Sequence, residues 1–268
     1  MSFQHVVYIT GVPRSGTSWV GQIINSSSQV CFRFQPLFSY EFKNRVNEDS
    51  SAKSFEEFFT SLSEAETDFI IQKDKIESGE YPAFKKLENK THLAFKENHY
   101  QSMIEPMLRK APHVKVIGII RSPCAVLNSW RKNPKEFPSG SDILKEWRFA
   151  NCKNKGNEDY FGYYKWKEVA NAYFDLQIKY PERFFLLKYE DLVSDSVEIT
   201  KEIFRFTCLP FEQQTKDFLE KSTTINNDSY YSVFKAHKNT EEWKQELHPY
   251  IQSEILEDLK NTRLEKFL

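Results

Sequence analysis

The sequence predicts a single α/β domain over residues 1–268, with a parallel sheet flanked by helices. Short runs rich in β-branched and aromatic residues alternate with helical segments, as in a sheet covered on both faces. These strands are expected at residues 5–10, 29–34, 92–96, 114–121 and 184–188. No repeat or low-complexity tract interrupts the 268 residues, a length that allows a sizeable core.

The first strand runs through a glycine loop directly into an apolar-faced helix. Gly11 and Gly16 let the backbone close around a ligand. A helix N-terminus carries N–H groups without partners and a partial positive charge, so the loop predicts an anion site. Arg14 adds a fixed cation. Hydroxyl donors are added by Ser15, Thr17 and Ser18.

The spacing of residues 11–18 matches the nucleotide P-loop, except that Thr17 stands where that motif requires lysine. A threonine can neither reach the terminal phosphates of ATP nor carry the charge. Arg14 could supply the charge for a nucleotide whose anionic tail is placed differently. The structural alternative is an ordinary glycine-rich turn between a strand and a helix.

The run 114–121 reads as a buried strand with Arg121 at its carboxyl end, the edge where ligands of open α/β sheets gather. Ser122 suits the cap of the next helix and Pro123 its first turn. This helix is expected to end near residues 130–132, and it carries Ser129 eight residues after Arg121. A structural salt bridge is the alternative role for Arg121.

The run 184–188 predicts another strand, which ends in Tyr189, Glu190 and Asp191. The two carboxylates could cap a helix that begins near residues 195–196.

Residues 13–19, Pro-Arg-Ser-Gly-Thr-Ser-Trp, resemble the 5′-phosphosulfate loop of sulfotransferases that use 3′-phosphoadenosine 5′-phosphosulfate (PAPS). Arg121 and Ser129 are similar to the family's 3′-phosphate site. The resemblance spans residues 6 to about 245. It is closer to bacterial and carbohydrate-type members than to the enzymes that act on phenols and steroids. Those enzymes carry the sequence Lys-Thr-His-Leu-Pro after the central strand, and residues 95–100 lack it. It implies a P-loop NTPase-like fold, PAPS as co-substrate, 3′-phosphoadenosine 5′-phosphate (PAP) as product, and no metal.

The resemblance also implies roles for individual residues. Tyr189 would lie beside the adenine. In the family a basic loop ahead of a Trp-Lys pair closes over the nucleotide; here the usual Arg-Lys-Gly is absent, and Lys235 and Lys238 are the candidates ahead of Trp243. The implied cofactor-binding residues are Arg14, Ser15, Gly16, Thr17, Ser18, Trp19, Arg121, Ser129, Tyr189, Lys235 and Lys238.

Sulfuryl transfer to an alcohol needs a base that takes the acceptor proton. His99 is the first candidate, since an unperturbed pKa of about 6.5 suits this task. Glu97 is the second, because several carbohydrate sulfotransferases use a glutamate, and Glu41 is the third. A segment before Glu41 resembles the family's Glu-Pro-Leu, but Gln35 replaces its glutamate. With Arg14 neutralising transition-state charge, the candidate catalytic residues are Arg14, His99, Glu97 and Ser129.

Residues 42–91 are charged and helical in places, and we expect them to form an insertion near the acceptor site. Six aromatic residues of this insertion are expected in the core: Phe55, Phe58, Phe59, Phe69, Tyr81 and Phe84. A helix over 162–180 presents one apolar face. The polar segment 221–242 is the candidate mobile lid.

The composition is balanced, with 37 Lys and Arg against 38 Asp and Glu, a net charge of -1. No nucleic-acid polymer or anionic membrane is implied as a partner. No stretch approaches the ~20 apolar residues of a membrane span, and no signal peptide is expected before the first strand. The four cysteines are dispersed, which suits a reducing compartment and offers no metal-ligand spacing. We therefore expect a cytoplasmic enzyme.

The leading hypothesis is a PAPS-dependent sulfotransferase that acts on a hydroxyl or amine of a carbohydrate or another polar metabolite. A kinase-like P-loop phosphotransferase is the second; Thr17 disfavours it, and Asp191 is the only approximate fit for a Mg²⁺ ligand. A non-catalytic nucleotide-binding module is the third.

Overall fold

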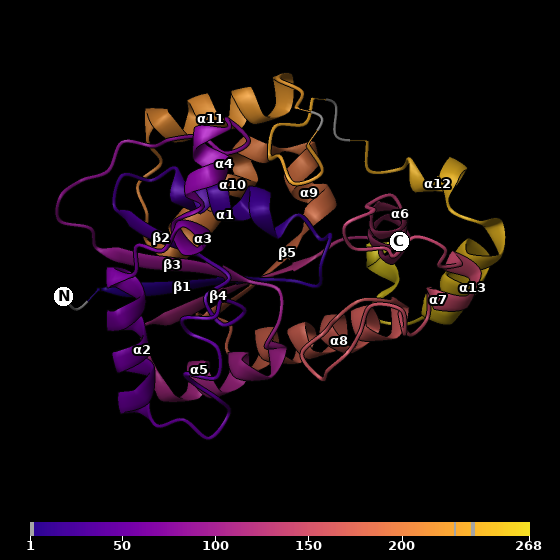
Figure 1. Ribbon diagram of the computed structural model, residues 1–268, viewed down its shortest axis with the longest axis horizontal. Helices are drawn as coiled ribbons and strands as arrows, with labels where there is room; N and C mark the ends of the chain where they lie inside the picture. The colour runs from indigo at the N-terminus through magenta and orange to yellow at the C-terminus, as the bar shows by residue number, and fades with distance from the viewer. Residues whose placement is uncertain (1–2, 228, 237–238) are drawn as a thin grey trace.

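A five-stranded parallel sheet forms the centre of the computed structural model, which describes residues 3–227, 229–236 and 239–268 (Figure 1). The strand order is β2-β3-β1-β4-β5, and Tyr8 on β1 pairs with Phe95 on β3 and Val116 on β4. The strands are β1 (His5–Thr10), β2 (Val30–Phe34), β3 (His92–Glu97), β4 (Val114–Ile120) and β5 (Phe184–Lys188). All five predicted strands are confirmed, each to within one residue.

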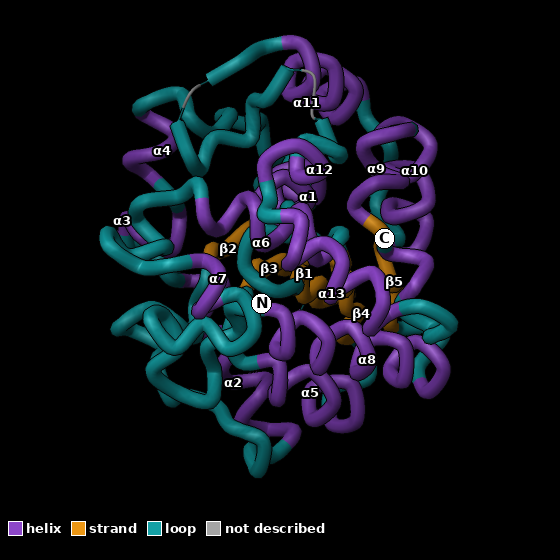
Figure 2. Tube along the Cα trace, turned by 90° about the vertical axis from the view of Figure 1, so that its right-hand side faces the viewer, coloured by secondary structure: helices purple, strands orange, loops and turns teal. Residues whose placement is uncertain are grey.

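Helices cover both faces of this sheet (Figure 2). The residues of β1 alternate between two cores, because successive side chains of a strand point to opposite faces: Tyr8 enters one core and Ile9 the other. The Tyr8 side is covered by α2 (Ala52–Glu64), α5 (Ile104–Lys110) and α8 (Tyr163–Lys179). The Ile9 side is covered by α1 (Thr17–Asn25), α9 (Tyr189–Ser194), α10 (Ser196–Thr207) and α11 (Gln213–Thr224).

The remaining helices complete the structure, and several lie beyond the carboxyl ends of the strands (Figure 1). They are α3 (Asp68–Ile71), α4 (Lys73–Glu77), η1 (Gln101–Met103), α6 (Pro123–Arg131), α7 (Ile143–Glu146), α12 (Trp243–Glu246), α13 (Pro249–Leu259) and η2 (Glu265–Phe267). The chain turns to opposite sides of β1 after its first and fourth strands, so a topological switch point lies beside β1, where α/β folds bind ligands.

The insertion 42–91 is helical only in α2, α3 and α4, and its aromatic residues divide between the core and the surface. Phe55, Phe58, Phe59 and Tyr81 are buried as expected. Phe84 is only partly buried and packs against α11. Phe69 departs from the prediction: it is 41% exposed, because the short helix α3 buries its neighbour Ile70 instead.

No helix within the described ranges is long and apolar enough to cross a membrane. All four cysteines are free thiols. The cytoplasmic location stays a prediction from the sequence.

Candidate active site

The glycine loop between β1 and α1 adopts a backbone that suits an anion. Arg14 and Gly16 both have left-handed φ angles, of 73° and 89°. Turns of this kind direct successive N–H groups into one concavity. The first-turn N–H groups of Thr17 and Ser18 have no carbonyl four residues earlier within the helix. A non-glycine residue in this region costs about 1–2 kcal/mol, so the surrounding contacts must hold Arg14 in this conformation.

Arg14 joins the two predicted phosphate sites. Its Nε donates to Ser129 Oγ at 3.1 Å, and its carbonyl accepts from Arg121 Nη1 at 3.1 Å. A second guanidinium nitrogen lies 3.6 Å from a carboxylate oxygen of Glu136. The structure thus brings Arg14 together with Arg121 and Ser129, each of which lies more than a hundred residues from it in sequence.

Buried polar atoms without partners line this part of the molecule. Among the described residues, nothing hydrogen-bonds to Ser15 Oγ or Arg121 Nε, although both atoms are buried. A buried donor that stays unpaired is costly. Phosphate or sulfate oxygens would satisfy both groups, so the residues present fit a nucleotide with two anionic groups, such as PAPS.

Tyr189 lies against the loop and explains the second glycine. A Cβ atom on Gly16 would come within 2.4 Å of the Tyr189 ring, so no larger residue fits there. The Arg121 guanidinium lies 4.8 Å from the centre of the same ring, and Trp19 meets it edge-on. Its predicted place beside the adenine stays a prediction.

The hydroxyls of the loop have different partners. Thr17 Oγ1 donates to Asn98 Oδ1 at 2.8 Å, which ties the loop to the end of β3. The Ser18 hydroxyl hydrogen-bonds the phenol of Tyr81 in the insertion. Of the three predicted donors, Ser15 therefore presents the hydroxyl that its protein neighbours leave unused.

The Glu97 carboxylate accepts its hydrogen bonds from backbone N–H groups. Its Oε2 accepts from the N–H groups of Leu37 and Phe38, and its Oε1 from those of Asn98 and His99, at 3.0–3.2 Å. Burial raises the pKa of this carboxyl, while the nearby His99, Lys96 and these N–H donors act in the opposite direction. This is the environment of a structural carboxylate that connects two loops, and it disfavours Glu97 as the base.

The ring of His99 is held in place by its neighbours. Its Nδ1 lies 2.8 Å from the carbonyl oxygen of Glu158 and 3.5 Å from an oxygen of Asp159, and its ring stacks on Phe38. A bond from Nδ1–H to a carbonyl leaves the lone pair of a neutral imidazole on Nε2. Glu41, in contrast, is exposed and accepts a bond from Thr67.

Lys96 is a residue that the sequence analysis missed. It is buried at the end of β3, and its Nζ lies 4.7 Å from the centre of the Phe34 ring. Burial lowers its pKa to about 7, against the opposing effect of Glu97. Within the described part of the chain no hydrogen-bond acceptor pairs with Nζ. The signal was a lysine inside an otherwise apolar run ahead of Glu97.

The cap of α6 also differs from the prediction. Ser122 stands at the N-cap, but its hydroxyl makes no capping bond. Instead Glu190 accepts a bond from Ser122 N–H at 2.9 Å, and α10 is capped by Asp195 rather than by Glu190 or Asp191. Pro123 occupies the first turn as expected.

Ser222, near the start of the segment 221–242, lies beside α1. Trp19 Nε1 donates to Ser222 Oγ at 3.0 Å, and Lys235 N–H donates to the Ser222 carbonyl. The Lys235 ammonium donates to the carbonyl of Asn227 at 2.7 Å, within its own segment. Lys238 lies outside the described residues, so the predicted 3′-phosphate contacts of both lysines, like the mobile lid, stay predictions.

A family model described as a sulfotransferase domain matches residues 4–264. The chain belongs to the sulfotransferase family. This membership confirms the resemblance seen in residues 13–19, and it agrees with the parallel sheet and loop described above.

The sulfotransferases compared with this chain share only modest sequence identity with it. Carbohydrate sulfotransferase 3 of Tetronarce californica is 29% identical over 135 residues, which cover 48% of this chain and 29% of that protein. Its counterpart in Mus musculus is 24% identical over 161 residues, which cover 57% and 33%. The chain thus spans about a third of the length of the curated relatives it matches. Mouse sulfotransferase SULT7A1, solved with PAP, has the same fold: 13% identity, a TM-score of 0.59, and coverage of 99% of this chain and 87% of that one.

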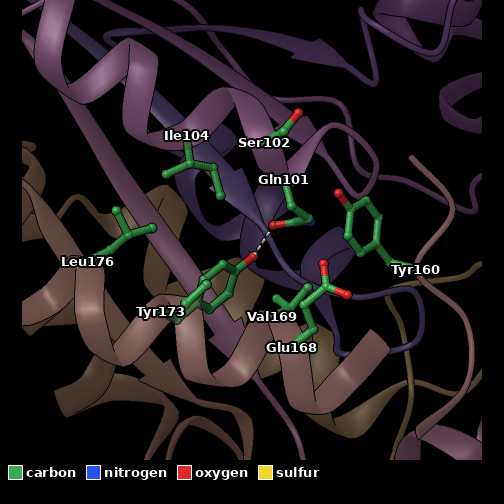
Figure 3. Close-up of a pocket in the computed structure, with 9 residues that line it drawn as sticks. Gln101, Ser102, Ile104, Tyr160, Glu168, Val169, Tyr173 and Leu176 are labelled. Carbon is green, nitrogen blue, oxygen red and sulfur yellow. Dashed lines mark hydrogen bonds between the residues drawn. The ribbon is translucent and has the colours of Figure 1, made fainter. Parts of the chain in front are cut away.

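A cavity of about 190 Å³ lies between η1, the start of α5 and α8 (Figure 3). Within it the Tyr173 hydroxyl donates to Gln101 Oε1 at 2.7 Å, and Gln101 Nε2 donates to Thr10 Oγ1 at 3.0 Å. The cavity is smaller than the 300–1,000 Å³ of typical ligand pockets. Its polar wall holds the end of β1, and thereby the start of the sulfotransferase loop.

Proposed function

We propose that this protein transfers the sulfuryl group of PAPS to a hydroxyl or amine of a polar acceptor such as a carbohydrate. The observation that carries the proposal is the glycine loop: Arg14 accepts a bond from Arg121 there, and two buried donors beside it, Ser15 Oγ and Arg121 Nε, lack partners among the described residues. Membership in the sulfotransferase family supports it, as do the relatives named as carbohydrate sulfotransferases.

Each step of the sulfuryl transfer is assigned to a different group of residues. An acceptor oxygen forms a bond to sulfur while the bond from sulfur to the leaving phosphate oxygen breaks, and the acceptor proton passes to Nε2 of His99. Arg14, Lys96 and the loop N–H groups neutralise the charge that develops on the leaving oxygen. Arg121 and Ser129 bind the 3′-phosphate.

Calorimetric titration with PAP and with ADP, both in EDTA, tests the nucleotide. We expect micromolar binding of PAP and much weaker binding of ADP, because ADP lacks the 3′-phosphate. Arg121→Ala should weaken PAP much more than adenosine 5′-phosphosulfate. A preference for ADP that appears only with Mg²⁺ would instead indicate a phosphotransferase. Asp191, the approximate fit for its Mg²⁺ ligand, is exposed on α9. PAP binding without turnover of any acceptor would indicate a binding module.

His99→Ala is expected to lower kcat by about 10²–10⁴-fold with PAP affinity unchanged, since it removes a proton acceptor and no nucleotide contact. Steady-state kinetics and PAP titration give the two numbers. Glu41→Ala tests the third candidate base in parallel, and we expect it to retain full activity, because Glu41 is exposed and accepts a bond from Thr67. A kcat within a few-fold of the wild type in His99→Ala would remove His99 from the reaction.

A further inference from the structure

Three cations from separate segments surround the ring of Tyr231. Lys75 Nζ lies 4.9 Å from the ring centre, Lys135 Nζ 5.5 Å and Arg14 Cζ 5.9 Å. Lys75 comes from the insertion, Lys135 from the loop after α6, and Tyr231 from the segment 221–242. An aromatic face attracts cations but does not neutralise them, so the cluster remains electropositive.

Carboxylates offset only part of this charge. Glu136 lies 3.6 Å from Arg14 and also accepts a bond from the Tyr231 hydroxyl. Glu97 is turned toward four backbone N–H groups. Lys75 has Glu80 in its vicinity and lies 3.4 Å from the Tyr81 hydroxyl; burial still lowers its pKa, and Lys135 adds to this effect. Lys75 is therefore partly desolvated and Lys135 is exposed, both lie over the Tyr231 ring, and among the described residues no carboxylate forms an ion pair with either lysine.

An aromatic surface connects this cluster with the proposed base. Lys75 Nζ lies 5.3 Å from the centre of the Phe34 ring, and Phe34 contacts Phe69 at 5.6 Å. Phe69 lies 6.4 Å from Phe38, whose ring stacks on His99 at 5.0 Å. Phe38 and Phe69 are 54% and 41% exposed. Exposed rings of this kind offer a flat apolar face to the carbon skeleton of a ligand.

We propose that the acceptor is itself an anion, whose carboxylate, sulfate or phosphate group is bound by Lys75 and Lys135 while its apolar face lies on Phe38 and Phe69. This inference rests on the proposed function, in which Arg14 and Lys96 serve the donor. The two remaining lysines then have no anion from the donor to neutralise, and charge-assisted bonds to an acceptor anion would satisfy them. An anionic sugar and an anionic aryl compound share this chemistry.

The test measures binding of matched acceptors to the PAP-saturated protein by calorimetry. One pair is a glucuronic-acid disaccharide and its carboxyl-reduced glucose counterpart; the other is 4-hydroxybenzoate and 4-hydroxybenzamide. We expect at least one acid to bind ten-fold or more tightly than its neutral partner, and the pair that responds distinguishes sugar from aryl acceptors. Lys75→Gln should abolish this preference, and Lys135→Gln should reduce it. Lys73→Gln is the matched control, because Lys73 lies on the same helix, exposed and 4.0 Å from Asp68.

The outcomes separate this inference from the proposed function. Failure of PAP to bind the wild type would refute the proposed function. Normal PAP binding with no preference for either acid, or with a preference that survives both lysine substitutions, would overturn the anionic acceptor alone. An equal loss of PAP affinity in Lys75→Gln would assign Lys75 to the nucleotide and overturn it as well. Melting temperatures of the variants show whether each one is folded.

Discussion

Arg14→Ala is expected to lower kcat by at least about 10²–10³-fold, the range found when a donor to a developing negative charge is removed. Arg14 hydrogen-bonds to both Ser129 and Arg121, through its side chain and its carbonyl respectively. The substitution leaves the carbonyl in place but removes the cation. We therefore expect a much larger loss in kcat than in PAP affinity.

Single-turnover rates and PAP titrations of Arg14→Ala and Arg14→Lys provide the measurement. Lysine restores the charge without the planar group that reaches Ser129 and Glu136, so it should recover only part of the rate. Arg45→Ala is the control: this arginine is exposed on the insertion and should be silent. Wild-type turnover in Arg14→Ala would refute the role of Arg14.

Lys96→Met is expected to lose turnover by a similar factor and yet to stabilise the protein without ligand at neutral and lower pH. The pKa of Lys96 falls from 10.5 to about 7 in the fold, so the unfolded chain holds this proton more tightly. Stability of the wild type therefore rises with pH between about 7 and 10.5, and the full penalty applies below pH 7. Removing the ammonium relieves the penalty, by about 1–4 kcal/mol if the site resembles other buried ionic groups.

Denaturant unfolding of the wild type and Lys96→Met at pH 6 and pH 10 checks the sign: the gain should be largest at pH 6 and should fade toward pH 10. Anion binding should recharge the lysine, so PAP titrations at pH 8 in buffers of different ionisation enthalpy should show proton uptake that the variant lacks. A variant that is less stable at pH 6, or that keeps its kcat, would contradict this account.

Local patterns in the sequence were sufficient for the sheet and for the anion-binding loop. The runs ending near Thr10 and Arg121 are apolar and β-branched, and the glycines at positions 11 and 16 follow the first of them. Since parallel strands place their carboxyl ends at one edge, Arg14 and Arg121 could be expected to meet there. The contact between Arg14 and Ser129 agrees with this expectation.

Capping and aromatic packing were predicted less well. Ser122 and Glu190 both follow strands and both suit a cap, and local spacing cannot reveal that Glu190 reaches across to the Ser122 N–H instead of capping the nearer helix. Phe69 has the same apolar character as its neighbours in the insertion. Its exposure depends on how the short helix α3 lies against β2.

The sequence by itself determined where the strands lie along the chain and where the anion-binding loop lies, because periodicity, glycine spacing and strand ends are local properties of the chain. Only the tertiary structure decided which polar groups face the cleft. Glu97 is turned to four backbone N–H groups, whereas Lys96 beside it is buried without a hydrogen-bond acceptor among the described residues. Burial and hydrogen bonding between distant segments decide what Lys96 and Glu97 contact. The residue types at neighbouring positions of one strand do not predict these contacts.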